Sequence, residues 1–400
     1  VAFIPVGGTY TMNFKEAAQQ TENYIIRNRR YLHEHPELSE KEEKTTEYIV
    51  KELKDLGLEP HRFENCYGCY VDIKGDKSGK IVALRADIDA LPIKEETGLE
   101  FASQNGCMHA CGHDTHMAML LGAVKMLNDV KSEINGTVRA IFQPSEETAT
   151  GAQAVIKEGV LDGVSAIYGS HIWGNFDAPL VSVESGKRMA SCSSFKIEIE
   201  GRTAHGSAPN LGVDAIVVAA SVIMNLQTYV SRNNDPLNPL VLTIGTIEGG
   251  SRFNVIPGKV TMEGTVRAFD SDLDRIPNAM RRITAGTAET FGAKAKLDFN
   301  RMTIPVINEN EKLNTIAQNA VKKLYGEDGL GHLDTMMGSE DFSFYMGKVP
   351  GVFSFLGSRD TEKGYIYTNH QEQYTVDEGL LKRGAAVYAQ FAFDYLEENK

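Results

Sequence analysis

Residues 194–201, SFKIEIEG, alternate apolar and polar side chains along one short run. This alternation is typical of a β-strand that buries one face and exposes the other to solvent. The next hundred residues predict a helix, two strands, a second helix and a last strand, and the order β-α-β-β-α-β is that of a ferredoxin-like domain. These predicted elements are helices at 213–231 and 272–291 and the strands LVLTIGTIEGG (240–250), VTMEGTVRAF (260–269) and AKLDFN (295–300).

The segments on either side of this stretch predict strands that alternate with helices. Residues 13–57 predict two helices, and Ser39 with Glu42 three residues later predicts an N-terminal cap for the second of them. Alternating strands and helices indicate an α/β layer structure with ligands at the strand ends. The other predicted elements are the strands YVDIK (70–74), KIVALRADID (80–89), GTVRAIFQ (136–143) and AIYGSHIW (166–173) and the helices 115–128, 151–159 and 377–398.

Together the two patterns predict an α/β protein with two domains. We expect a discontinuous α/β/α catalytic domain formed by residues 12–185 and 301–400. A ferredoxin-like (βαββαβ) α+β domain, residues 186–300, is inserted in it. The length of 400 residues agrees with this division, because single hydrophobic cores rarely grow beyond about 250–300 residues.

The composition argues against several kinds of partner. A net charge of −13 is unfavourable for binding nucleic acid or an anionic membrane. No run of 18 apolar residues occurs, so the sequence predicts no membrane-spanning helix. Five cysteines are few and odd in number, which argues against a disulfide framework and for a reducing compartment. We therefore expect a cytoplasmic protein with a small-molecule substrate.

Side chains that can bind metal ions gather at the predicted strand ends. MHACGHDTH (108–116) places a cysteine and three histidines beside a helix, with a Cys-x-His spacing too short for a structural zinc knuckle. An isolated histidine is more often a structural residue, and an adjacent glutamate pair is usually a solvated face. The combination indicates a dinuclear site, which needs about four to six ligands. The candidate ligands are Cys111, His113, Glu147, His171 and His370, and Glu146 beside them can accept a proton from water.

These motifs resemble those of a known enzyme family over almost the whole chain. HPEL (35–38), RADIDALP (85–92), MHACGHDTH, FQPSEE (142–147), SHIW (170–173) and TNH (368–370) are similar to dinuclear-metal amidohydrolases of the aminoacylase/carboxypeptidase superfamily. The most similar branch contains hippurate hydrolases, N-acyl-amino-acid amidohydrolases and plant auxin-conjugate hydrolases. The resemblance implies two divalent ions per subunit, of zinc, manganese, cobalt or nickel.

The resemblance also implies roles for individual residues. Cys111 is a ligating and often bridging thiolate, the other four candidate ligands complete the two metal spheres, and Glu146 is the general base. Asp89 is expected to orient a ligand. Asp114 could do the same, but we favour a role in capping the helix that follows it.

Three further candidates lie in the inserted domain. GRTAHGSAP (201–209) matches the family's G-x-x-x-H-G-x-x-P turn, which implies that His205 stabilises the tetrahedral oxyanion. In dimeric relatives this histidine reaches the partner's active site, so the resemblance implies a homodimer or a dimer of dimers. Asn254 in FNVIPG (253–258) would lie nearby, and Arg267 is either a carboxylate clamp for the substrate or a surface arginine on a strand.

The expected activity is hydrolysis of the amide bond of N-acyl amino acids, namely N-acetyl, hippurate-like or related conjugates. The alternative within enzymes is a metallo-dipeptidase or carboxypeptidase that acts on small peptides, since the same groups can hydrolyse any accessible amide. A binding protein on an inactive scaffold is a different possibility, and the complete set of ligands and base argues against it. A single or structural metal ion is a further alternative, which the metal content per chain would distinguish.

Overall fold

The computed structural model describes residues 3–6, 9–270 and 274–399. These residues form two compact units. The first comprises the chain up to Arg188, Ile307–Asp334 and the chain from Asp341 onward, and the second comprises Met189–Val306 and Thr335–Glu340. The first unit is therefore discontinuous in sequence, and the second consists of one long inserted segment and the short segment Thr335–Glu340.

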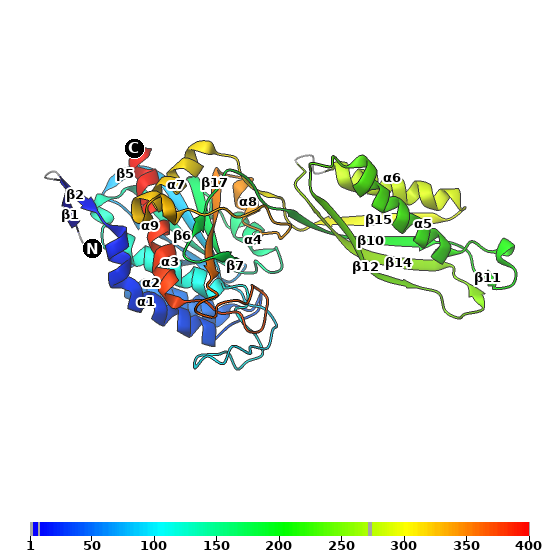
Figure 1. Cartoon of the computed structure of the whole chain (residues 1–400), viewed down its shortest axis with the longest axis horizontal. Helices are drawn as coiled ribbons and strands as arrows, with labels where there is room; N and C mark the ends of the chain where they lie inside the picture. The colour runs from blue at the N-terminus through cyan, green and yellow to red at the C-terminus, as the bar shows by residue number, and fades with distance from the viewer. Residues whose placement is uncertain (1–2, 7–8, 271–273, 400) are drawn as a thin grey trace. The chain divides into compact units, whose positions relative to one another are not determined.

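A seven-stranded mixed sheet forms the middle layer of the first unit (Figure 1). In sheet order its strands are β3 (His61–Arg62), β4 (Cys69–Lys74), β6 (Asn135–Gln143), β5 (Lys77–Asp87), β7 (Val164–Asp177), β17 (Gly351–Arg359) and β8 (Val181–Ser182). The four central strands β6, β5, β7 and β17 run parallel, and β3, β4 and β8 join through antiparallel pairs. The carboxyl ends of the parallel strands therefore meet at one edge of the sheet, where ligands bind in this architecture.

Helices cover both faces of this sheet. They are α1 (Phe14–Glu34), α2 (Glu43–Asp55), α3 (His113–Asn128), α4 (Gly151–Lys157), α7 (Glu311–Tyr325), α8 (Ser343–Met346) and α9 (Leu381–Glu398). Helices α1, α3 and α9 pack against one another, and α4 and α8 contact β6 and β17 respectively. Consecutive residues of β7 point to opposite faces: the Tyr168 ring stacks on Phe391 of α9, and Gly169 lies against Phe342, next to α8.

The predicted Ser39 cap of α2 is wrong. The helix begins at Glu43, and the Ser39 hydroxyl instead donates a hydrogen bond of 2.6 Å to Asp89 Oδ2. The first turn of α2 is satisfied by Glu37, whose carboxylate accepts from the backbone N–H of Thr45 at 2.8 Å. Ser39 lies four residues before Glu43, too early for the N-cap position, which Glu42 occupies, so its hydroxyl bonds near the end of β5 and not to the helix.

A four-stranded antiparallel sheet forms the second unit. Its strands, in sheet order, are β12 (Leu240–Gly249), β14 (Lys259–Ala268), β10 (Ser191–Glu200) and β15 (Lys294–Arg301). The helix α5 (Ala215–Thr228) follows β10, and α6 (Arg275–Thr290) follows β14. The first and third strands in chain order lie in the centre of the sheet, which is the ferredoxin-like arrangement predicted from the order of the elements.

One face of this sheet carries the second hydrophobic core. Phe195, Ile197 and Ile199 are buried, whereas Lys196 and Glu200 are exposed, so the alternation in SFKIEIEG marks the core face as predicted. Helices α5 and α6 both contribute buried side chains to this core, and they lie side by side (Figure 1).

The helical segment Ala215–Asn233 is long and apolar enough to cross a membrane, by length and composition alone. It comprises α5 and a π-helical turn at Tyr229–Asn233. Val218, Val222 and Leu226 of this segment are buried in the core of the second unit. Its apolar character is thus partly explained by packing against the sheet.

Shorter elements complete the described chain. Three two-stranded sheets pair β1 (Phe3–Val6) with β2 (Thr9–Met12), β9 (Gly186–Met189) with β16 (Val306–Asn308), and β11 (Ala204–His205) with β13 (Val255–Ile256). Single 3₁₀ turns lie at Lys131–Glu133, Pro209–Leu211, Glu327–Gly329 and Glu378–Leu380.

Candidate functional site

The five candidate metal ligands and the candidate base all lie in the first unit. They come from segments far apart in the sequence that meet near the carboxyl ends of the parallel strands. The segments are the loop before α3 with Cys111, the first turn of α3 with His113, the turn after β6 with Glu146 and Glu147, β7 with His171, and the loop between β17 and α9 with His370.

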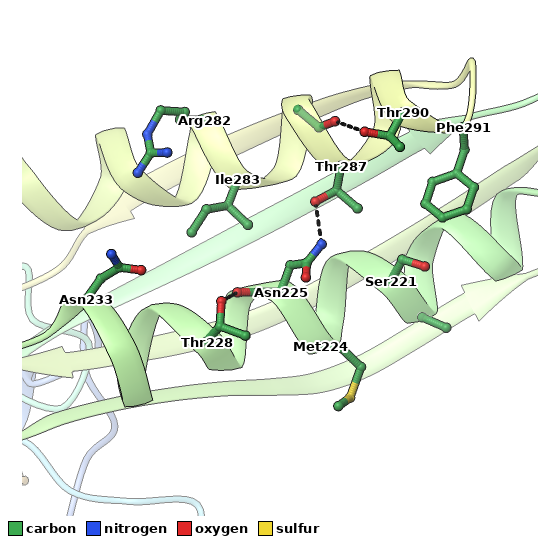
Figure 2. A pocket seen from close by; sticks show the side chains of 12 residues that line it. Ser221, Met224, Asn225, Thr228, Asn233, Arg282, Ile283, Thr287, Thr290 and Phe291 are labelled. Carbon is green, nitrogen blue, oxygen red and sulfur yellow. Dashed lines mark hydrogen bonds between the residues drawn. The ribbon is translucent and has the colours of Figure 1, made fainter.

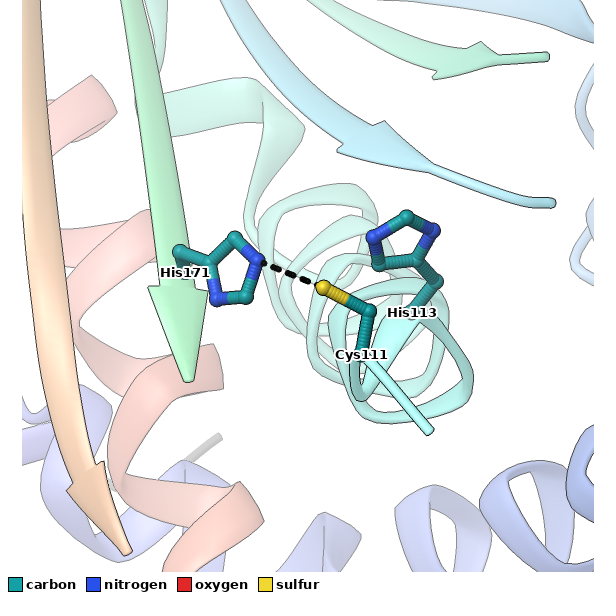
Figure 3. A group of neighbouring side chains, drawn as sticks. All are labelled: Cys111, His113 and His171. Carbon is teal, nitrogen blue, oxygen red and sulfur yellow. Dashed lines mark hydrogen bonds between the residues drawn. The ribbon is translucent and has the colours of Figure 1, made fainter. Parts of the chain in front are cut away.

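Cys111 lies at the centre of this group. Its Sγ atom is 3.4 Å from His171 Nε2 and 3.2 Å from His370 Nε2. Figure 3 shows the Cys111 sulfur directed toward the His171 ring, with His113 on the neighbouring helical turn. The donor atoms of Cys111, His113 and His171 all lie within 4.8 Å of one another, as do those of Cys111, Glu147 and His370.

The two glutamates extend the group further. Glu147 Oε1 lies 3.7 Å from His370 Nε2 and 3.9 Å from His113 Nε2. Glu146 joins His113 and Glu147 in a third set of donors within 4.8 Å. Its Oε1 also accepts a hydrogen bond of 3.4 Å from the backbone N–H of Asp341. The structure thus brings together all six of these residues.

The donor set fits a divalent cation. His113 Nε2 and Glu147 Oε1 are buried, and within the described part of the chain neither has a hydrogen-bond partner. Such buried polar atoms are costly unless something satisfies them. A soft thiolate, imidazole nitrogens and a carboxylate are the ligands that zinc and similar transition metals prefer.

The pKa shifts of Cys111 and Glu147 also favour a bound cation at this site. Burial and the carboxylates of Glu147 and Glu146 raise the pKa of the Cys111 thiol well above its usual range. Burial and the nearby Asp89 carboxylate, opposed by His113, raise the pKa of Glu147 to about 7. Without a cation both groups keep their protons to a higher pH than usual. A bound divalent ion would displace those protons, because metal ligands must be deprotonated.

Comparison with known proteins identifies the family. The sequence profile described as Peptidase family M20/M25/M40 matches residues 83–394. The chain belongs to this family. The N-acetylcysteine deacetylase of Bacillus subtilis strain 168 is 40% identical over 379 residues, which cover 94% of this chain and 98% of that relative. The thermostable carboxypeptidase 1 of Saccharolobus solfataricus is 38% identical over 386 residues, covering 95% and 98% of the two chains.

A solved structure agrees with this membership in the M20 family. The crystal structure of a Bacillus subtilis protein, described as a dinuclear metal binding peptidase of the M20 family, superposes with a TM-score of 0.84. It is 37% identical in sequence, and the match covers 95% of this chain and 99% of that one. The resemblance found in the motifs and the predicted fold class are therefore confirmed.

Asp89 supports two of the candidate ligands in this M20 chain. Its backbone carbonyl accepts a hydrogen bond of 2.8 Å from His113 Nδ1, which leaves Nε2 of that ring facing Glu147. Its Oδ2 accepts from the backbone N–H of Glu147 at 3.0 Å. Asp89 thus orients a histidine and a glutamate of the group at once, as outer partners of metal ligands do.

The expected capping role of Asp114 is wrong. The N-cap of α3 is Gly112, which has no side-chain capping bond, and the Asp114 carboxylate points to α1. Its Oδ2 accepts from Arg29 Nε at 3.0 Å and lies 2.8 Å from His33 Nδ1. These three side chains are buried, and ionised hydrogen-bonded partners outweigh a backbone N–H. Asp114 therefore ties the first turn of α3 to α1.

A second buried network, which the sequence did not predict, lies beside the His171 ring. His116 Nδ1 is 2.6 Å from Asp87 Oδ1, and His116 Nε2 accepts from the backbone N–H of Ile172 at 2.8 Å. Arg85 Nη1 donates to the other oxygen of Asp87 at 2.6 Å. Both oxygens of Asp87 and both nitrogens of His116 are thus engaged, so these groups support the part of β7 that carries His171. Asp87 lies in the RADIDALP motif, but nothing in the sequence pointed to His116 as its partner.

The remaining predicted residues lie in the second unit. His205 is exposed on β11 and pairs with Val255 of β13, and the backbone N–H of Gly206 donates to the Asn254 carbonyl at 2.8 Å. The backbone N–H of Ser207 donates to His205 Nδ1 at 3.2 Å. The proton of a neutral His205 ring therefore lies on Nε2, which makes that nitrogen a hydrogen-bond donor.

Arg267 lies on β14, where it is half buried. Its Nη1 donates to the Ser339 hydroxyl at 2.9 Å, and both residues belong to the second unit. One hydrogen bond to a neutral hydroxyl uses a single donor of a guanidinium that has five. Arg267 thus retains capacity to bind a carboxylate.

Gly112 sets the angle between Cys111 and His113. It has a φ of +92°, and a Cβ placed there would lie 2.5 Å from Ile172 Cγ2. We expect Gly112→Ala to lower the free energy of unfolding by about 1–3 kcal/mol beyond the cost of left-handed backbone. We also expect it to lower the metal affinity. Chemical denaturation and metal titration would measure the two effects.

Gly57→Ala is the matched control for this prediction. Gly57 has a φ of +76°, but no heavy atom lies within 4 Å of its virtual Cβ. Gly57→Ala should lower the free energy of unfolding by about 1–2 kcal/mol, the cost of an alanine in left-handed backbone, and should leave the metal affinity unchanged. Equal effects of the two substitutions would show that contact with Ile172 is unimportant.

Proposed function

We propose that this M20 family chain hydrolyses the amide bond of N-acyl amino acids with the aid of two divalent metal ions. The observation that carries the proposal is the single group of donors around Cys111, with the carboxylate of Glu146 beside it. The similarity to a deacetylase of N-acetylcysteine supports the substrate class. Cytoplasmic location belongs to the same proposal.

The donors divide into two sets that share the Cys111 thiolate. One set would be completed by His113 and His171 and the other by Glu147 and His370. Ions bound there would act as Lewis acids on the amide carbonyl and lower the pKa of water. Thiolate and imidazole ligands suit zinc, cobalt or nickel, and the resemblance adds manganese.

Glu146 would act as general base and then as general acid. Its carboxylate takes one proton from the water that attacks the amide carbon, and so becomes a neutral acid. It then gives that proton to the amino nitrogen as the C–N bond breaks. The products are a carboxylic acid and a free amino acid. A positioned acid–base group of this kind contributes about 10²- to 10⁴-fold to the rate.

The second unit would supply the groups that bind the substrate. His205 offers its Nε2–H to the developing oxyanion, where such a donor acts most strongly. Asn254 would assist it, and Arg267 would hold the substrate carboxylate through parallel hydrogen bonds. These roles rest on the motif resemblance together with the donor tautomer of His205.

We also propose a homodimer or a dimer of dimers formed through the second unit. A groove of about 780 Å³ runs between α5 and α6, and Figure 2 shows Met224 and Phe291 among the side chains that line it. Their exposed fractions are 67% and 43%. Exposed apolar side chains on adjoining helices, with the edge strand β12 in the same unit, are features of self-associating surfaces.

A peptidase is the second candidate. The observation in its favour is the similarity to a thermostable carboxypeptidase over 95% of this chain. An N-acyl amino acid and a dipeptide both present an amide followed by a free carboxylate. The two candidates therefore differ in what they bind on the acyl side of the amide.

Removing and restoring the metal tests the proposal. We expect dialysis against a chelator to abolish hydrolysis, because the ligands then lack the ions that polarise the carbonyl. Zinc, manganese, cobalt or nickel should restore release of the amino acid. The assay is ninhydrin detection on a panel of N-acetyl, N-benzoyl and indoleacetyl amino acids and dipeptides.

The panel distinguishes the candidates. Metal-dependent release from one acyl class supports the amidohydrolase, and activity on dipeptides alone supports the peptidase. Hydrolysis that persists in the metal-free protein would contradict both.

A further inference from the structure

Asn369 connects three of the segments that carry candidate ligands. It precedes His370 in TNH. Its Nδ2 donates to the backbone carbonyl of Cys111 at 2.9 Å and to that of Ile172 at 3.2 Å. Its Oδ1 accepts from the backbone N–H of Gly174 at 2.9 Å. One side-chain amide therefore joins the loop before α3, the part of β7 next to His171 and the loop before α9.

The orientation of the amide is fixed by its partners. The two carbonyls can only accept, so the nitrogen must face them, and the N–H of Gly174 can only donate, so the oxygen must face it. A carboxylate in place of the amide would set an oxygen against two carbonyl oxygens. Aspartate at position 369 therefore keeps the shape of the side chain and reverses the interaction.

The carbonyl of Ile172 has a second donor. His171 Nδ1 lies 2.6 Å from this same oxygen, which leaves His171 Nε2 directed at Cys111. A shift of the Ile172 peptide therefore rotates the His171 ring. Asn369 holds the carbonyl side of Ile172, and His116 holds its N–H side.

His370 itself has an unusual backbone conformation. Its φ of +70° lies in the left-handed region, which costs energy for a residue with a Cβ and persists only where the surroundings enforce it. The N–H of His370 donates to the Ala110 carbonyl at 2.8 Å. With the Asn369 side chain on the neighbouring carbonyl of Cys111, the loop is held to the Cys111 segment at two points.

We propose that Asn369 is a positioning residue that sets the mutual geometry of Cys111, His171 and His370, and through it the affinity for metal. This inference rests on the proposed metal-dependent function. Partners outside the ligand set typically change metal affinity by about 10- to 100-fold when they are lost. Asn369 touches no reacting group, so its effect passes through the three ligands that it aligns.

Asn308 is a matched control for Asn369. It is also an asparagine of the first unit whose side chain makes three hydrogen bonds to backbone, each at 2.9 Å. Its Nδ2 donates to the carbonyls of Glu184 and Phe353, and its Oδ1 accepts from the N–H of Phe353. It belongs to none of the candidate donor sets. Asn308→Asp therefore causes the same kind of structural damage without touching the ligand segments.

The test measures cobalt binding to the full-length protein after chelation. Cobalt(II) bound to thiolate and imidazole absorbs in the visible range, so its spectrum reports ligand geometry without any assay of activity. We expect Asn369→Asp to raise the cobalt Kd by about 10- to 100-fold and to change the absorption bands. Asn308→Asp should lower Tm but leave the Kd and the bands as in the wild type.

The possible outcomes separate the two proposals. Equal Kd values and equal spectra for the two variants would overturn the role of Asn369 while leaving the metal centre intact. A wild-type protein that binds no cobalt would overturn the metal centre itself, and this inference with it. If Asn369→Asp does not fold, Asn369→Ala and Asn308→Ala, which remove the same hydrogen bonds without adding charge, give the same comparison.

Discussion

Glu146→Gln is expected to lower kcat by about 10²- to 10⁴-fold with no loss of bound metal. The carboxamide has the size of the carboxylate, and its oxygen can still accept the backbone N–H of Asp341, as Glu146 Oε1 does. It cannot take a proton from water at neutral pH. Steady-state kinetics on the best N-acyl substrate, with metal analysis of the same sample, would measure the effect.

Glu158→Gln is a suitable control for this substitution. Glu158 also accepts hydrogen bonds from backbone, those of Glu64 and Asn65, but belongs to none of the candidate donor sets. The Glu158→Gln protein should keep the wild-type kcat. A Glu146→Gln protein that is fully active would place the base elsewhere, and one that loses metal would make Glu146 a ligand.

Cys111→Ala should have the second large effect. The Sγ atom lies within 3.4 Å of both His171 Nε2 and His370 Nε2, so it is shared by both candidate sets of ligands. Its removal should weaken metal binding by more than the roughly 10- to 100-fold lost with an outer partner, and activity should fall with the metal content. Elemental analysis after gel filtration would count the ions per chain.

Cys69→Ala separates loss of a ligand from loss of packing. Cys69 is likewise a buried free thiol, on β4, and belongs to none of the candidate donor sets. The Cys69→Ala protein should retain the full metal content and lose only some stability. Two tightly held ions in Cys111→Ala would rule out a shared thiolate.

The features that were predictable from sequence are those that repeat over a short distance or follow from strand topology. The alternation in SFKIEIEG marks a core face because a strand buried on one side must alternate. Glu146, Glu147 and His171 were recognisable as candidate donors because they lie on or just after apolar strands, and parallel strands bring their carboxyl ends together. Cys111, His113 and His370 lie in loops or at the start of a helix, and their residue types and the motif resemblance pointed to them.

The two wrong capping predictions share a physical cause. Ser39 and Asp114 each occupy a position that local rules assign to a helix cap. Ser39 bonds instead to Asp89, fifty residues away, and Asp114 to Arg29, eighty-five residues away. In both cases a charged, buried partner from a distant part of the chain holds the side chain, and local rules for helix caps cannot anticipate such a partner. Asn369 escaped notice similarly, since the partners by which it joins the ligand segments, Cys111, Ile172 and Gly174, lie far along the chain.

The discontinuity of the first unit also affects the order in which the protein can be completed during synthesis. Strand β17 pairs with β7 only after the entire second unit has left the ribosome, because the second unit lies between them in the chain. A folded insert shortens the effective loop that this pairing must close. His370, beyond β17, is the last of the five candidate ligands to be made. Synthesis proceeds at about 5–20 residues per second. The nascent chain therefore spends many seconds with Cys111 and His113 already made but without the complete set of candidate ligands.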